Sequence, residues 1–312
     1  MITYVRAIVV GLVASAGVFI SVSAQSQSET KPSEKKYDLA IPHTKERQFF
    51  YSETKLQKLD FNGNRPAPDI FRLWLQCDPT DSGDKYTCIS FTIQSGTNPE
   101  ISIPQLSNWS YVFKLSATDE KGQVLGIDHA PFEKLVDAKN NVVPVDKAYH
   151  VYNAFIDFHS MNVFADKSPS GKGIQDLHYV GDKIVHYAAF SQPPVNLGAN
   201  IKEGSVFKNG QITLFLKGIG AVNNVSTAII EYDSGESSFK MIFSPMPSMD
   251  VTTTGSSHYW GDIYKSLRSG WIQRAVLHEF VVSETVIPGQ ANKVPTAIER
   301  TIEIRNTTPL KK

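Results

Sequence analysis

Residues 225–243 read VSTAIIEYDSGESSFKMIF, in which two runs rich in β-branched and aromatic residues flank Asp-Ser-Gly-Glu. Runs of this kind on either side of a turn-forming tetrapeptide predict two antiparallel strands joined by a hairpin. The predicted strands are 225–232 and 239–243, with the turn at 233–236. The same pattern recurs along the chain, so this stretch decides the fold class.

Four further hairpins follow from the same pattern. Asn209-Gly210 separates strands predicted at 205–208 and 211–217, because both central residues of a type I′ turn need positive φ. The other three join 70–77 to 86–93, 111–117 to 123–127, and 259–267 to 271–282. Short antiparallel strands at this spacing predict a mainly β protein, either a β-sandwich or open barrel-like sheets.

Two segments indicate helix. Asp128–Ala138 (DHAPFEKLVDA) predicts one short helix, since Asp128 is a good N-cap and Pro131 falls in the first turn. Ala148–Phe164 fits helical and strand spacing, and its aromatic and β-branched content favours a strand. The fold class therefore includes one or two short helices.

The first 24 residues predict export. Arg6 precedes an uncharged apolar run at 7–23, and Val22-Ser23-Ala24 offers the small residues that signal peptidase reads, with cleavage between Ala24 and Gln25. An uncleaved membrane anchor is the alternative, although about 17 apolar residues lie at the lower limit for a span. We predict a cleaved signal peptide and a soluble periplasmic or extracellular chain without a transmembrane span.

Composition and cysteine content support this prediction. Apolar residues are 41% of the chain, too many for a disordered protein, and 31 basic residues balance 31 acidic ones, which argues against a nucleic-acid partner. Cys77 and Cys88 lie in the predicted strands 70–77 and 86–93. An even count after an export signal predicts one disulfide between them, and two free buried thiols are the alternative.

The domain organisation has two interpretations. Residues 25–36 are polar and predict a flexible tether after the cleavage site. Residues 166–173 (DKSPSGKG) read as a linker between β-rich domains at 37–165 and 174–312. A single large β domain, with 166–173 as a surface loop, is equally compatible.

Asp157 and His159 are the candidates for chemistry. On a strand, residues i and i+2 share a face, whereas on a helix they lie about 200° apart. A metal site needs a third ligand, for which we consider His178, with His150 and Asp176 as alternatives. Gly181-Asp182 predicts a type II′ hairpin that places His178 on its polar face.

Searches for a nucleophile elbow, a P-loop and a zinc-protease helix find no complete motif. We therefore expect a non-enzymatic binding or envelope-associated module that needs no cofactor. Its partner would be a small apolar molecule, a glycan or a protein bound on a sheet face. The alternative is a metal-assisted hydrolase that uses Asp157, His159 and a third ligand.

Overall fold

The computed structural model describes residues 35–59, 65–81, 83–113, 127–128, 130–168, 171–186, 190–191, 201–208, 210–246 and 249–309. Within these residues the protein is mainly β, as predicted, with thirteen strands in one antiparallel sheet. The single α-helix among them is α1 (Val145–Ala165). The predicted signal peptide, its cleavage site between Ala24 and Gln25, and most of the tether 25–36 lie outside the described residues.

The sheet is open. The strands are β1 (Gln48–Leu59), β2 (Asp69–Thr80), β3 (Gly83–Ser95), β4 (Ile101–Ser102), β5 (Ser110–Phe113), β6 (Lys183–His186), β7 (Phe190–Ser191), β8 (Val206–Lys208), β9 (Ile212–Val222), β10 (Val225–Met246), β11 (Met249–Ser266), β12 (Ile272–Val286) and β13 (Val294–Thr307). Three 3-10 helices are η2 (Pro104–Leu106), η3 (Ala130–Phe132) and η4 (Ile174–Asp176). The strand order is β4-β3-β2-β1-β13-β12-β11-β10-β8-β7, while β5 pairs with β3 and β9 pairs with β10 and β6.

The two halves of the chain share this sheet. β1 pairs with β2 on one side and with β13 on the other, so segments before and after 166–173 are hydrogen-bonded neighbours. Strands from both sides of the segment 166–173 therefore belong to the same sheet. None of the helices in the described part of the chain combines the length and apolarity needed to cross a bilayer.

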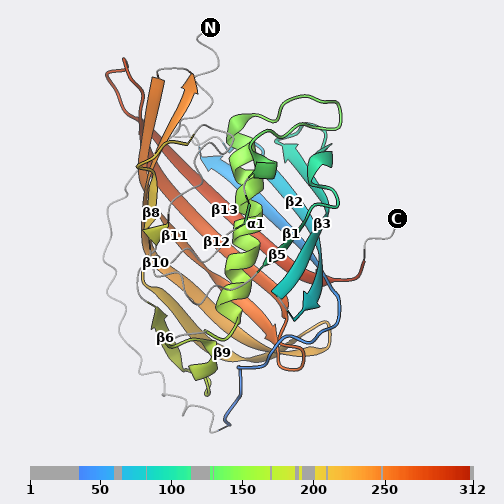
Figure 1. Ribbon diagram of the computed structural model, residues 1–312. Coiled ribbons are helices and arrows are strands. Elements are labelled where there is room, and N and C mark those ends of the chain that lie inside the picture. Colours follow the sequence, from blue (N-terminus) through green and yellow to red (C-terminus); the bar gives the residue numbers. More distant parts are fainter. Residues whose placement is uncertain are drawn as a thin grey trace, which may run out of the picture.

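One face of the sheet is buried by α1. Alternate residues of β2, such as Phe71, Leu73 and Leu75, are buried, as expected when one face of each strand is covered. In Figure 1, α1 lies against one face of the sheet, with the β2–β3 end and the β10–β8 end on either side of it. We call the face that α1 covers the inner face and the opposite one the outer face.

The strand prediction for 148–164 is wrong, because this segment forms α1. Val151, Phe155 and Phe158 are fully buried at helical spacing. Their burial against the sheet outweighs the strand preference of a segment rich in aromatic and β-branched residues. The short helix predicted at 128–138 reduces to η3 and an isolated bridge between Val136 and Val142.

The hairpin predicted at 225–243 is also wrong. β10 runs through the supposed turn, with a bulge between Asp233 and Glu236 and with Gly235 at φ 57°. Pairing resumes at Glu236 opposite His258, because β11 is long enough to continue the ladder beyond the bulge. The turn-like residues therefore make an irregularity inside one long strand.

Of the other predicted hairpins, some are confirmed and others are wrong. β2–β3 and β11–β12 are hairpins as predicted. At Asn209-Gly210 the prediction fails, since β8 and β9 both pair with β10. It fails at Gly181-Asp182 too, because β6 pairs with β9. The hairpin predicted at 111–127 falls largely on 114–126, outside the described residues.

Cys77 and Cys88 are free, buried thiols, so the predicted disulfide is absent. The strands extend into the expected connector 78–85 as far as Thr80, which pairs with Gly83. This register places Cys77 opposite Tyr86 and leaves Cys88 two positions further along β3. Burial raises the pKa of the Cys88 thiol to about 12, so it is protonated at neutral pH.

Candidate functional site

The three predicted metal ligands have separate partners. The Asp157 carboxylate binds Arg300, His159 Nε2 lies 2.7 Å from the Tyr111 hydroxyl, and His178 Nδ1 lies 3.3 Å from a backbone oxygen. Within the described residues there is no group of three or more His, Cys, Asp or Glu side chains placed to hold a metal. The predicted site does not form, because Asp157 and His159 lie on a helix and diverge by about 200°.

His159 is part of the aromatic core. Its ring stacks on Phe113 with centroids 4.2 Å apart and meets Tyr86 edge-on at 4.7 Å. Burial lowers the pKa of His159 to about 3, so the imidazole is neutral. It therefore serves as a hydrogen-bonding partner for Tyr111 between α1 and β5.

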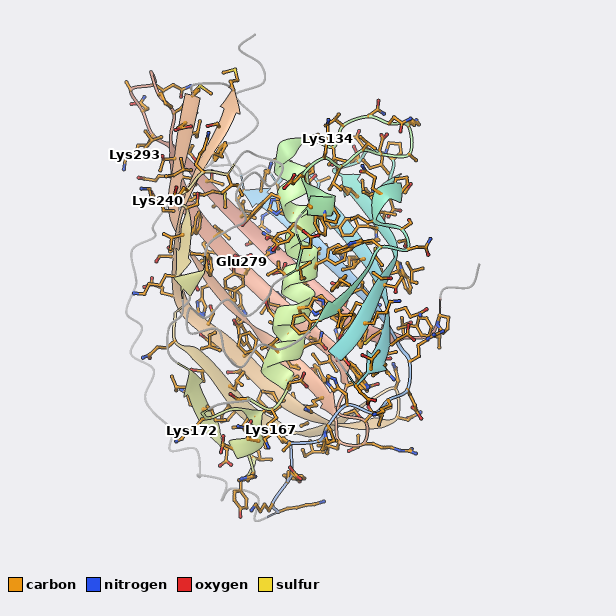
Figure 2. All side chains as sticks on the ribbon, viewed as in Figure 1. Lys134, Lys167, Lys172, Lys240, Glu279 and Lys293 are labelled. Atoms are coloured by element: carbon orange, nitrogen blue, oxygen red, sulfur yellow. The ribbon has the colours of Figure 1, made fainter. Side chains whose placement is uncertain are left out.

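Asp157 belongs to a buried charge cluster that also contains Glu279 and Arg300. Glu279 on β12 lies directly opposite Arg300 on β13, and the Arg300 Nε donates to it. Arg300 Nη1 donates to Asp157 Oδ2 at 2.5 Å, which links α1 to the sheet. Figure 2 shows Glu279 near the centre of the view, beside α1, whereas Lys240 and Lys293 lie at the periphery.

Two carboxylates share one guanidinium in this cluster, so one negative charge is uncompensated. Burial, with the charge of Glu279, raises the pKa of Asp157 from 3.8 to about 6, although Arg300 acts in the opposite direction. Tyr259 on β11 also hydrogen-bonds to Glu279, and burial raises the pKa of that phenol. The side chains of the cluster are hydrogen-bonded to one another, so the cluster connects α1, β11, β12 and β13.

We expect Asp157→Asn to remove a pH dependence of stability. A carboxyl whose pKa is raised in the folded state stabilises the fold below its unfolded pKa and loses that contribution as pH rises through the folded pKa. The unfolding free energy of the wild type, relative to the variant, should therefore fall by about 2–3 kcal/mol between roughly pH 4 and pH 8. Urea denaturation across this range measures it, and a constant difference would contradict the raised pKa.

The outer face carries an aromatic patch on β11 and β12, formed by His258, Trp260, His278 and Phe280. Trp260 lies opposite His278, and His258 lies opposite Phe280, so the four rings are cross-strand neighbours. The Trp260 ring stacks on His278 at 5.7 Å and meets His258 edge-on at 5.4 Å. Trp260 is 41% exposed and Phe280 38%, and Asp233 binds His258 Nε2 at 3.1 Å on the β10 side.

Elsewhere the outer face carries several ion pairs. Arg72 Nε lies 3.0 Å from Glu53 across β1 and β2. Glu303 on β13 binds Arg274 at 3.0 Å and Arg305 at 2.6 Å. These ion pairs are typical of a solvated sheet face, whereas Trp260 and Phe280 expose large apolar rings on β11 and β12.

Comparison with known proteins does not assign the chain to a family. No protein-family model matches the chain, and no curated protein matches it significantly. Among solved structures it is similar to OmpT, an outer membrane protein of Vibrio cholerae, with 11% identity and a TM-score of 0.16 over 84% of this chain and 99% of that one. A loop L8 deletion mutant of OmpT gives 10% identity and a TM-score of 0.15 over the same shares. Likenesses this weak carry no argument.

The sequence analysis missed the aromatic patch, although a signal was present. In the confirmed β11–β12 hairpin, Tyr259 and Ile263 mark the buried phase of the alternation. Trp260 falls in the opposite phase, where polar residues are expected. Several aromatic residues in the solvent phase of adjacent strands form a contiguous patch, which indicates a binding surface.

Proposed function

We propose that this protein is an exported, non-enzymatic binding module that recognises a carbohydrate on the aromatic patch. The observation that carries the proposal is the exposed Trp260 ring, held between two imidazoles on the outer face of the sheet. Residues 1–24 support export, since they have the form of a cleavable signal peptide.

A carbohydrate fits this surface because a sugar ring has an apolar C–H face and a rim of hydroxyl groups. Trp260 provides a partly exposed aromatic ring, and Asp233 with the two histidines provides hydrogen-bonding groups around it. A small apolar ligand would instead need an enclosed, mostly apolar pocket. The mixture of exposed rings and polar neighbours therefore favours a sugar over that alternative.

We expect Trp260→Ala to weaken carbohydrate binding about tenfold or more, because truncating a central interface Trp costs about 2 kcal/mol. The measurement is isothermal titration of the full chain with soluble β-glucan, mannan, xylan and galactan. Trp74→Ala is the matched control, since Trp74 lies on the same face but is tilted against Tyr51 at 4.7 Å.

Saturable binding that Trp260→Ala weakens and Trp74→Ala leaves unchanged would support the proposal. The absence of saturable binding to all four polysaccharides would overturn it. Equal losses in the two variants would also overturn it, because the effect would then belong to the sheet as a whole.

A further inference from the structure

A polar depression lies on the outer face next to the aromatic patch. It has a volume of about 490 Å³ and is bordered by β8, β10, β11 and the connection after β8. Its polar lining includes Lys208, Gln211, Glu236, Ser238 and Ser256. The lining offers hydroxyl, amide, carboxylate and ammonium groups, which together both donate and accept hydrogen bonds.

The strand register makes the depression continuous with the patch. Ser256 lies opposite Ser238, and Ser238 lies opposite Lys208, which gives one row of outer-face residues. The next row along β11 pairs His258 with Glu236, and the row after it contains Trp260. Ser256 and Trp260 are four residues apart, or about 13 Å along the strand at about 3.3 Å per residue.

From this arrangement we infer that the depression is a second subsite for the same ligand, so that the protein recognises a neutral saccharide chain of at least three units lying along β11. The inference rests on the proposed function. One sugar ring would stack on Trp260, and a unit further along the same chain would hydrogen-bond in the depression. That distance along the strand exceeds the width of one sugar ring, so a monosaccharide would not reach both subsites.

The charge of the subsite favours a neutral chain. Lys208 and Glu236 contribute one positive and one negative charge to the lining, and the remaining groups are uncharged. An acidic chain would gain little net attraction here and would meet Glu236, which lies opposite His258 beside the patch. The sequence as a whole carries no net charge that would attract a polyanion.

The test is titration of the full chain with cello-, manno- and xylo-oligosaccharides of increasing length, from the monosaccharide to the hexasaccharide. We expect the affinity for at least one series to rise about tenfold or more once the chain reaches both subsites. Ser256→Val should weaken binding of the longer oligomers about three- to tenfold and leave binding of the monosaccharide unchanged. Thr252→Val replaces a hydroxyl by a methyl group on the same face of β11, outside the depression, and should leave the affinity for every oligomer unchanged.

The outcomes separate this inference from the proposed function. Binding that depends on Trp260 but does not increase with chain length, or equal behaviour of Ser256→Val and Thr252→Val, overturns the second subsite alone. Tighter binding of polygalacturonate oligomers than of every neutral series overturns the neutral specificity. Failure of every oligosaccharide and polysaccharide to bind overturns both proposals.

Discussion

Arg300→Met is expected to lower the free energy of unfolding by about 3–5 kcal/mol at neutral pH, which is the usual cost of removing one partner from a buried ion pair. The substitution preserves an extended side chain and removes the guanidinium that both Asp157 and Glu279 contact. Two nearly buried carboxylates then face each other without a cation. Urea denaturation followed by circular dichroism measures the loss.

The stability deficit of Arg300→Met should also depend on pH. Protonation of Asp157, whose pKa is raised, relieves the unpaired charge, so the deficit of Arg300→Met should shrink as pH falls towards about 5. Arg274→Met is the matched control, because Arg274 forms its pair with Glu303 on the exposed outer face. That control should cost at most about 1 kcal/mol. Similar losses in the two variants would show that the inner cluster is not a buried network.

Replacement of the whole cluster tests the same reasoning from the other side. A buried ion-pair cluster stabilises the fold little relative to apolar side chains of similar volume, although removal of only one partner lowers the stability strongly. The triple variant Asp157→Leu, Glu279→Met, Arg300→Met should therefore recover most of the stability that Arg300→Met loses.

The strand content was predictable because apolar and polar residues alternate locally along the strands. β2 shows it directly, with Phe71, Leu73 and Leu75 buried and the residues between them half-exposed. Connectivity was less predictable, because a Gly-containing tetrapeptide is compatible with a turn and with a bulge. At Asp233–Glu236 the decision depended on β11, a partner long enough to pair with both sides of the bulge.

The inner cluster was beyond sequence analysis for a related reason. Arg300 and Asp157 are 143 positions apart, and they meet only once α1 docks on a sheet in which β12 and β13 are neighbours. A strand at 148–164 would place Asp157 beside His159, whereas the helix directs Asp157 towards Arg300. Trp260 is different, because the alternation along a single hairpin is enough to predict that its side chain points to solvent.

Phe158→Ala is expected to cost about 3–5 kcal/mol, because it leaves a cavity where α1 meets the sheet. The Phe158 ring is fully buried and lies edge-on to Phe50 at 5.2 Å and to Tyr86 at 5.7 Å. These two partners come from β1 and β3, so the ring joins α1 to strands on both sides of β2. Urea denaturation, compared with the same truncation in Phe280→Ala, measures the effect.

The control separates core packing from loss of an aromatic ring. Phe280 is 38% exposed on the outer face, so its truncation leaves no enclosed cavity and should cost clearly less than truncation of the fully buried Phe158. A helix rich in aromatic and β-branched residues has little stability in isolation, so α1 depends on its contacts with the sheet. Phe158→Ala should therefore also reduce the helical signal at urea concentrations below the main transition. A loss no larger than that of Phe280→Ala would mean that α1 does not bury this ring against β1 and β3.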